Sequence, residues 1–300
     1  MKIYVDYTNT PSFSKKGYLT LKENFNNVNW TDKIENSYDS DAIIVKPSFC
    51  SNDVLDKYPN LSFIQLITAG FDNIDLDYLA KRKIKLLNAS DVFNIAIAED
   101  VISKILYINK HMKFYEDNRN NKIWESKLVE YEIYGSTIGI LGVGGIGIET
   151  AKRLKAFNTK ILGYRRSIHK EEHFDEIYND DEGLDHILKT SDYIILAIPL
   201  NDATHHLINK EKLSLMKESA VLINVSRGEV VNQDDLIEIL KNNKIRAAAL
   251  DVVTPEPLIE DSLLWELDNV FLSPHSSNLS PYTEDRLVNK ITKNLKKEME

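Results

Sequence analysis

Short runs of isoleucine, leucine and valine recur along the whole chain, and polar or amphipathic segments separate them. The runs lack strict alternation of apolar and polar positions, which is typical of parallel strands that helices cover on both faces. Amphipathic segments at residues 51–58, 75–81, 184–188 and 234–241 supply candidate covering helices. The pattern therefore predicts an α/β fold in two consecutive sets of strands. The predicted strands are residues 3–5, 42–45, 63–67, 84–87, 138–141, 160–164, 193–198, 221–225, 247–252 and 270–272.

Two helical segments set the predicted domain boundaries. Residues 95–115 read as one long helix that begins after Asn94 and ends in the polar run 116–122, so it forms the crossover into the second set. At the other end of the chain, Leu287, Ile291 and Leu295 recur at helical spacing. That last helix can pack back on the first set. We therefore predict one domain from residues 1–94 and 279–300, and a second from residues 95–278.

A glycine-rich turn lies in the middle of the chain, between a predicted strand and a predicted helix. Residues 142–147 read Gly-Val-Gly-Gly-Ile-Gly, and residues 148–157 continue with helical spacing. Strand, G-x-G-x-x-G and helix in this order form the dinucleotide-binding fingerprint, although glycine turns also serve purely structural roles. In the fingerprint, Gly142 permits the tight turn, Gly144 admits the pyrophosphate and Gly147 lets the helix pack closely. The backbone at Gly145 and Ile146 then offers N–H groups to the phosphates.

Composition excludes several classes of protein. The 300 residues are 43% hydrophobic and 28% charged, which is ordinary for a globular protein of two domains. The net charge of -9 argues against nucleic acid binding, which calls for a basic surface. No apolar run approaches the about 20 residues that cross a bilayer. With one cysteine, Cys50, and no H-E-x-x-H pattern, the sequence predicts a cytoplasmic protein without a metal site.

Three polar segments follow predicted strands of the second domain, where open α/β sheets bind their ligands. Arg227 follows residues 221–225 and offers a planar fork of donors to a carboxylate or a polarised carbonyl. Glu256 and His275 follow the next two strands. An imidazole that transfers a proton beside a carboxylate that orients it is a common acid–base pair. Taken singly, each residue has an ordinary alternative as a surface ion pair, a turn or a loop histidine.

Together these motifs resemble the D-isomer-specific 2-hydroxyacid dehydrogenases over nearly the whole chain. The family includes glyoxylate/hydroxypyruvate reductases, D-lactate dehydrogenases and phosphoglycerate dehydrogenases. The segments that carry the resemblance are residues 142–147, 198–200 with Thr204, 222–228, 249–252, 256–258 and 273–275, together with 68–75 and the helix start at 94–99.

The resemblance implies two doubly wound parallel-sheet domains, a flavodoxin-like substrate domain and a Rossmann dinucleotide-binding domain, in a homodimer formed through the latter. It makes Arg227 the ligand of the substrate's carboxylate and carbonyl, His275 the proton donor and Glu256 the hydrogen-bond partner of His275. The remaining implied contacts are Lys46, Thr68, Ala69 and Gly70 to the substrate, and Pro199, Thr204, Val225, Ser226 and Asp251 to the cofactor.

One departure from the family pattern concerns the cofactor. At the end of the second nucleotide-domain strand, an acidic residue normally accepts hydrogen bonds from the ribose 2′-OH. This chain has Arg165, Arg166 and Ser167 there, directly after Tyr164. Guanidinium groups and a hydroxyl suit a 2′-phosphate, so we predict NADP(H) in preference to NAD(H). In the alternative, both arginines face solvent and the selectivity is poor.

The sequence thus predicts an NAD(P)H-dependent reductase of a small 2-keto acid such as glyoxylate, hydroxypyruvate or pyruvate. A dinucleotide-sensing protein with little turnover on the same scaffold is the alternative from another class, and a formate or phosphite dehydrogenase is a third. Asp100 follows Glu99 where many relatives carry histidine, and Ser276 and Ser277 replace small apolar residues. The identity of the acid, the physiological direction and the oligomeric state stay open.

Overall fold

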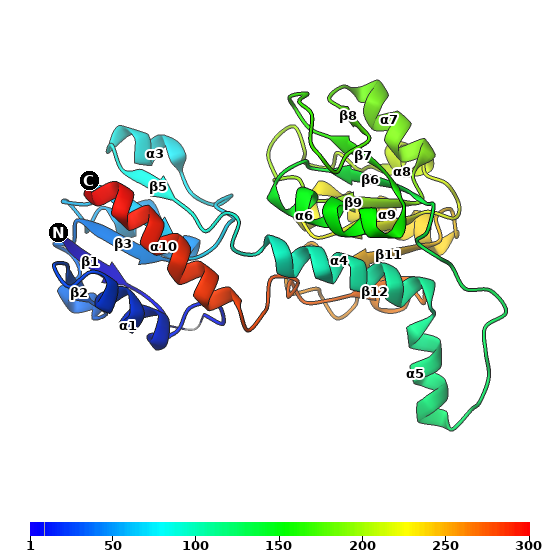
Figure 1. The fold of residues 1–300 in the computed structure, drawn as a ribbon, viewed down its shortest axis with the longest axis horizontal. Coiled ribbons are helices and arrows are strands. Elements are labelled where there is room, and N and C mark those ends of the chain that lie inside the picture. Colours follow the sequence, from blue (N-terminus) through cyan, green and yellow to red (C-terminus); the bar gives the residue numbers. More distant parts are fainter. Residues whose placement is uncertain (9) are drawn as a thin grey trace. The chain divides into compact units, whose positions relative to one another are not determined.

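The computed structural model describes residues 1–8 and 10–300, and the chain forms two compact units. The first unit consists of Met1–Phe93 and Leu279–Glu300, and the second of Asn94–Asn278. Each unit is a parallel β-sheet with helices against it, which confirms the predicted α/β fold (Figure 1).

The sheet of the first unit has five parallel strands in the order β2-β1-β3-β4-β5, the flavodoxin-like order. Its central strands β3 and β4 are fully buried, as their uninterrupted apolar runs require. The strands are β1 (Lys2–Val5), β2 (Asn29–Thr31), β3 (Ala42–Val45), β4 (Phe63–Leu66) and β5 (Lys85–Leu87), and the helices are α1 (Lys15–Asn24), α2 (Asn52–Leu55), α3 (Leu76–Lys81) and α10 (Thr283–Met299).

Helix α10 brings the end of the chain back to its beginning. It lies beside α1 in the first unit (Figure 1), and Leu287, Ile291 and Leu295 are completely buried there. The carboxylate of Glu284, in the first turn of α10, accepts hydrogen bonds from the backbone N–H of Ser14 at 2.6 Å and of Gly17 at 3.2 Å. These are N–H groups at the start of α1, which lack partners within that helix. The first unit is therefore assembled from two distant parts of the sequence.

The sheet of the second unit has seven parallel strands in the order β12-β11-β10-β9-β6-β7-β8. Counted within this unit, that is the Rossmann order 3-2-1-4-5-6 with one further strand, so the strand order reverses between β6 and β9. The strands are β6 (Thr137–Leu141), β7 (Lys160–Tyr164), β8 (Glu176–Tyr178), β9 (Tyr193–Leu196), β10 (Val221–Asn224), β11 (Ala247–Leu250) and β12 (Val270–Leu272). The helices are α4 (Asn94–Asn109), α5 (Met112–Asn121), α6 (Gly145–Leu154), α7 (Asp181–Thr190), α8 (Lys210–Ser214) and α9 (Gln233–Lys241).

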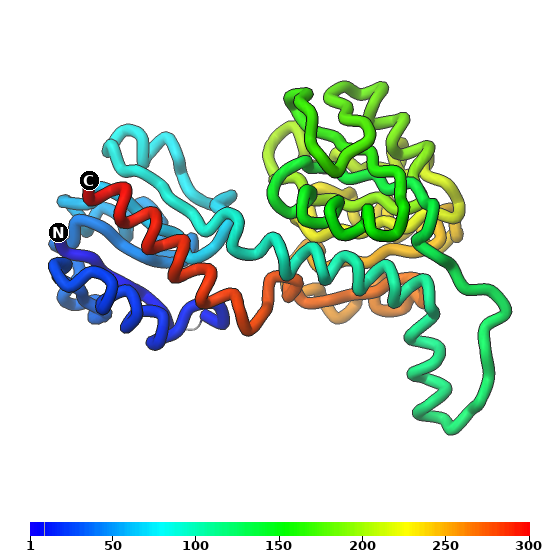
Figure 2. Tube along the Cα trace, in the orientation of Figure 1, coloured from blue at the N-terminus to red at the C-terminus, as the bar shows by residue number. Residues whose placement is uncertain are grey.

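The prediction of one long helix over residues 95–115 is wrong. The helix stops at Asn109, His111 adopts a left-handed conformation with φ of 46°, and α5 starts at Met112 in a new direction. The polar run from residue 116 belongs to α5 as far as Asn121, and Asn118 within it is buried. Figure 2 shows α5 and the chain after it leading away from the rest of the second unit.

Candidate active site

The glycine loop joins β6 to α6 at the point where the strand order reverses. Gly142 has φ of 112°, a conformation that side chains rarely permit, and a Cβ there would collide with the carbonyl of Ala197. A Cβ on Gly147 would collide with the carbonyl of Gly142. In contrast, a Cβ on Gly144 would meet no described atom within 4 Å. The turn and the close helix packing thus account for Gly142 and Gly147, whereas nothing in the chain itself requires Gly144 to be glycine.

The three polar segments leave the sheet together. Asn224 of β10 pairs with Leu250 of β11, and Leu250 pairs with Leu272 of β12, so the three strands end in register. The chain then continues from these strands to Arg227, Asp251 and His275, respectively. The structure therefore brings the three segments to one edge of the second unit's sheet, the edge at which open α/β sheets bind ligands.

His275 and Glu256 form a pair. Nδ1 of His275 lies 2.8 Å from Oε2 of Glu256, and the two side chains keep 46% and 38% of their surface exposed. The other carboxylate oxygen of Glu256 accepts a hydrogen bond from the N–H of Val253 at 3.2 Å, which fixes its orientation. Both residues line a cavity of about 540 Å³, with Pro257, Leu258 and Trp265 among its apolar walls. The pair thus presents a solvent-accessible imidazole, held by a carboxylate, to a partly apolar cavity.

Asp251 organises the backbone beside this pair. Its carbonyl accepts the N–H of His275 at 2.8 Å, and its carboxylate accepts Ser273 Oγ at 2.6 Å, Ser276 N–H at 3.0 Å and Ser277 N–H at 3.1 Å. The side chain is only 1% exposed. Burial alone would raise the pKa of Asp251, but these hydrogen bonds and the nearby charge of Lys104 outweigh it and lower the pKa. Asp251 is therefore held as an anion beneath the loop that carries His275.

Arg227 is fixed by the turn after β10. Its Nη1 donates to the carbonyl of Ser226 at 2.7 Å, and its own carbonyl accepts from the side-chain amide of Asn224 at 2.9 Å. The Asn224 side chain also accepts the N–H of Ser226 at 3.0 Å. Before this turn, the N–H of Val225 donates a hydrogen bond at 3.2 Å to the carbonyl of Leu196, which lies on the neighbouring strand β9. The turn therefore holds the Arg227 backbone through a buried asparagine that sequence reasoning did not assign to the site.

The other predicted cofactor contacts lie in loops of the same unit. After β9, Thr204 Oγ1 donates to the carbonyl of Pro199 at 2.7 Å, which closes the turn that carries both residues. After β7, Arg166 and Ser167 are exposed and Arg165 is half-buried.

A partly exposed carboxylate from further along the loop lies beside one of the arginines. Arg165 Nη1 is 3.6 Å from Glu171 Oε1 and also contacts His169, which in turn lies 3.2 Å from the same oxygen of Glu171. Sequence reasoning missed Glu171 because it follows the end of β7 by seven residues rather than directly, and the loop folds back. A carboxylate is therefore already paired with one of the guanidinium groups that we predict around a 2′-phosphate.

The predicted substrate residues lie in the first unit, after the neighbouring strands β3 and β4, whose last residues Val45 and Leu66 pair. Lys46 directly follows β3. Thr68 Oγ1 donates to the carbonyl of Gly70 at 3.1 Å, and the side-chain amide of Asn88 donates to the carbonyl of Ala69 at 2.9 Å. These bonds occupy carbonyl oxygens and leave the loop after β4 tightly turned.

The described part of the chain holds neither a cluster of potential metal ligands nor a membrane-spanning helix. No cluster of three or more histidine, cysteine, aspartate or glutamate side chains in residues 1–8 and 10–300 could hold a metal ion. Over the same residues, no helix combines the length and the apolar character needed to span a bilayer.

Fold and glycine loop together define a two-domain α/β protein of the class that binds nicotinamide dinucleotides. The model of the D-isomer specific 2-hydroxyacid dehydrogenase NAD binding domain matches residues 102–277. Glyoxylate reductase of Pyrococcus horikoshii is 38% identical over 251 residues, which cover 81% of this chain and 75% of that protein. The chain belongs to the D-isomer specific 2-hydroxyacid dehydrogenase family, which confirms the resemblance seen in the sequence.

Solved structures agree with this assignment. An acyclic imino acid reductase in complex with NADPH and D-Arg has a TM-score of 0.86 at 25% identity, over 100% of this chain and 97% of that one. D-lactate dehydrogenase from Aquifex aeolicus, complexed with NAD and lactic acid, has a TM-score of 0.81 at 27% identity, over 100% and 95%. Each of the two matches covers both units of this chain.

Proposed function

We propose that the protein is an NAD(P)H-dependent reductase that converts a small 2-keto acid, such as glyoxylate or hydroxypyruvate, into the D-2-hydroxy acid. The observation that carries this proposal is the His275–Glu256 pair, which lies at the same sheet edge as Arg227 and in the same unit as the glycine loop. The similarity to proteins named glyoxylate reductase supports a small acid as the substrate.

The residues divide the reaction between them. When bound, the nicotinamide cofactor would supply the hydride that reduces the carbonyl carbon. Arg227 binds the carboxylate and the carbonyl oxygen of the acid, and its positive charge stabilises the negative charge that develops on that oxygen. Because Nδ1 of His275 faces Glu256, Nε2 is the nitrogen that delivers the proton to the oxygen. Glu256 stabilises the imidazolium before the transfer and keeps the ring oriented. Loop residues Lys46, Thr68, Ala69 and Gly70 bind the substrate carboxylate in this proposal.

The glycine loop and the predicted groove residues receive the dinucleotide. The open space at Gly144 fits a pyrophosphate, because a backbone without a side chain there lets phosphate oxygens approach the N–H groups of Gly145 and Ile146. Pro199, Thr204, Val225, Ser226 and Asp251 would line the remainder. We propose NADPH as the preferred cofactor, with Arg165, Arg166 and Ser167 around the 2′-phosphate and NADH as the alternative. Glu171 weakens this preference, since it must yield Arg165 to the phosphate.

A second copy of the chain is the partner that we propose. Residues 123–134, which we call the arm, follow α5 and hold Trp124 and Leu128 fully exposed. The arm is nevertheless anchored: Tyr115 donates to Glu130 at 2.8 Å, and the guanidinium of Arg246 stacks 3.9 Å from the ring centre of Tyr131. Large apolar side chains presented on an anchored segment mark a surface for another protein.

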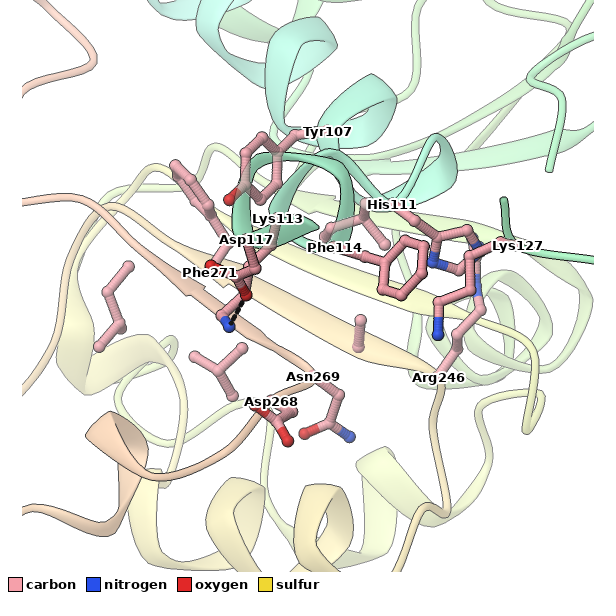
Figure 3. A pocket seen from close by; sticks show the side chains of 14 residues that line it. Tyr107, His111, Lys113, Phe114, Asp117, Lys127, Arg246, Asp268, Asn269 and Phe271 are labelled. Carbon is pink, nitrogen blue, oxygen red and sulfur yellow. Dashed lines mark hydrogen bonds and ion pairs between the residues drawn. The ribbon is translucent and has the colours of Figure 1, made fainter. Parts of the chain in front are cut away.

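The same unit offers a matching cavity of about 660 Å³ beside the arm (Figure 3). Phe114 and Phe271 contribute apolar walls, and the charged side chains of the lining are of both signs: Lys113, Lys127, Arg246, Asp117 and Asp268. An exposed apolar arm and a cavity with apolar walls on one unit suit reciprocal exchange between two copies, the usual form of a two-fold interface.

We also propose the cytoplasm as the compartment. The single cysteine, Cys50, is buried as a free thiol, which is compatible with a reducing environment.

The test is parallel oxidation of NADPH and NADH by the purified protein with glyoxylate, hydroxypyruvate, pyruvate and bulkier 2-keto acids. We expect turnover with a small acid, and we expect His275→Ala to lose at least about a hundredfold in kcat while dinucleotide affinity stays near wild type. His186→Ala, which removes an exposed histidine on α7, is the matched control. Tight dinucleotide binding without turnover on any acid would instead favour the sensor alternative.

A further inference from the structure

Lys104 is a buried cation in the second unit, outside the residues assigned to the site. It lies on α4, its side chain is only 1% exposed, and its ammonium group lies 5.7 Å from the centre of the Phe271 ring. Burying an ammonium group is costly unless a counter-charge accompanies it, so a fully buried lysine requires an explanation. Simple packing against an aromatic ring would be served better by an apolar side chain of the same length.

Two carboxylates face this ammonium group. Asp100, one turn earlier on α4, forms an ion pair with it, and Oδ1 of Asp251 lies 3.9 Å away. Asp251 is as deeply buried as Lys104, at 1% exposure, whereas Asp100 keeps 26% of its side chain exposed. Asp100 alone would suffice as the counter-charge of a lysine on the helix surface. The position of Lys104 between the two carboxylates therefore points beyond a helix-stabilising pair.

The Asp251 carboxylate links this ammonium group to the histidine loop. It accepts Ser273 Oγ, Ser276 N–H and Ser277 N–H, which bracket His275 on both sides, while the Asp251 carbonyl takes the N–H of His275. His275 itself is held at φ of 49°, a left-handed conformation that is strained for a residue with a side chain. Such a conformation persists only where surrounding contacts enforce it.

We propose that Lys104 is a positioning residue: it keeps Asp251 anionic, so that Asp251 holds the loop backbone that presents His275. The proposal rests on the reductase function above, because that function gives His275 its role. A protonated Asp251 would turn one acceptor oxygen into a donor that faces the N–H groups of the loop. The loop would then lose the contacts that maintain its left-handed residue.

The charged groups around Asp251 define how the Lys104–Asp251 pair responds to pH. Lys104 and Asp100 face it from α4, and Glu256 and His275 belong to the adjoining loops. The pKa of Asp251 is lowered although burial opposes it, and the charge of Lys104 is one of the causes. Removing that charge raises the pKa of Asp251, so the anion is lost at a higher pH as the solution is acidified.

The test uses Asp100→Asn as the matched background, because removing Lys104 alone would leave two carboxylates facing one another. Asp100→Asn retains the Lys104–Asp251 pair, whereas Asp100→Asn/Lys104→Met replaces the cation with an apolar chain of similar length. We expect the acid limb of the kcat/KM profile of the double variant to lie about one to three pH units above that of Asp100→Asn. Asp100→Asn/Lys104→Gln, which keeps a donor but no charge, should show the same displacement and serves if the methionine variant does not fold.

A structural role predicts a different outcome: a lower melting temperature with an unchanged pH profile, which would overturn the proposal. A readout without turnover separates this inference from the proposed function. The NMR signal of the His275 ring proton is assigned by its absence from the spectrum of His275→Gln. In the double variant, the chemical shift of this proton should show an additional pH-dependent displacement that Asp100→Asn lacks. If no 2-keto acid is reduced but this displacement occurs, the proposed function fails while the positioning role stands. The absence of the displacement overturns the positioning role whatever the activity.

Discussion

Two glycines of the same loop should respond to an added methyl group in opposite ways. At Gly147, a Cβ would fall on the carbonyl oxygen of Gly142, well inside the 3.0 Å that Cβ atoms keep from other atoms. Neither partner can rotate away, because the obstacle is backbone. At Gly144, a Cβ would meet no described atom within 4 Å. The Gly147→Ala variant must therefore separate α6 from β6, whereas Gly144→Ala leaves the unliganded fold intact.

The magnitudes follow from these contacts. Forcing a packed helix about 1 Å from its strand costs about 1–3 kcal/mol, and the rigid backbone obstacle places Gly147→Ala at about 3 kcal/mol. For a domain of 150–250 residues, that lowers the melting temperature by about 6–12 °C. Gly144 has φ of -112°, which alanine also adopts. Replacing Gly144 with alanine restricts the unfolded chain, which stabilises the folded state by about 0.4–1 kcal/mol. Alanine is a poorer N-cap than glycine by a similar amount, so the net change in the free energy of unfolding is close to zero.

Denaturant unfolding of both variants without ligand, followed by fluorescence titration with NADPH, measures both effects. We expect Gly144→Ala to unfold with the wild type but to bind the dinucleotide at least about tenfold more weakly, because its methyl group occupies the approach of the pyrophosphate. Equal destabilisation by the two substitutions would refute the structural argument. Undiminished NADPH affinity in Gly144→Ala would refute the placement of the phosphates.

Three further predictions concern separate parts of the chain. Arg165→Ala should raise the KM for NADPH by at least about tenfold more than the KM for NADH, because a charge-assisted bond to a phosphate is worth about 1.5–3 kcal/mol. Equal effects on the two KM values in steady-state kinetics would contradict this prediction. Trp124→Glu with Leu128→Glu should convert a dimer into a monomer in light scattering at unchanged thermal stability, and an unaltered mass would exclude the arm. Partial burial alone would raise the pKa of Glu284, but its hydrogen bonds from Ser14 and Gly17 lower it, so its contribution is present above pH 4.5 and is lost as the pH falls through the folded-state pKa. Glu284→Gln should therefore destabilise the protein by about 1 kcal/mol at pH 7 and by much less at pH 3 in urea titrations.

The buried strands were the most predictable part of the fold. The runs at residues 42–45, 160–164 and 270–272 became β3, β7 and β12 with the same bounds. The fully buried β3 shows the reason most clearly, because a strand covered on both faces must be apolar throughout. Strands β2 and β8 were missed. Both are three-residue edge strands that include polar residues, Asn29 and Thr31 in β2 and Glu176 in β8, whereas the edge strand β12 reads Val-Phe-Leu. The pairing of β2 and β8 comes from backbone hydrogen bonds that no apolar run records.

The break at His111 was missed for a related reason. Apolar spacing continues from α4 into α5, and nothing in the local sequence requires a left-handed residue there. Contacts far along the chain settle the direction of α5, such as the bond from Tyr115 to Glu130.

The site divides in the same way. The order of Arg227, Glu256 and His275 along the chain indicated a shared edge, because parallel strands bring their carboxyl ends together. The order of residues along the chain does not reveal which residues hold these groups in place. Lys104 reads as one more charge on an amphipathic helix, and only packing reveals that it is buried beside Asp251.

The return of α10 to the first unit has a consequence for the order in which the protein is made. The second unit is one continuous stretch, Asn94–Asn278, and every strand and helix that it needs leaves the ribosome in sequence. The first unit begins earlier but lacks Leu287, Ile291 and Leu295 until translation has passed through the whole of the second. The nascent chain therefore carries an unfinished N-terminal sheet, with its apolar face open to water, while the later part folds. During synthesis, the first unit to start is the last to finish.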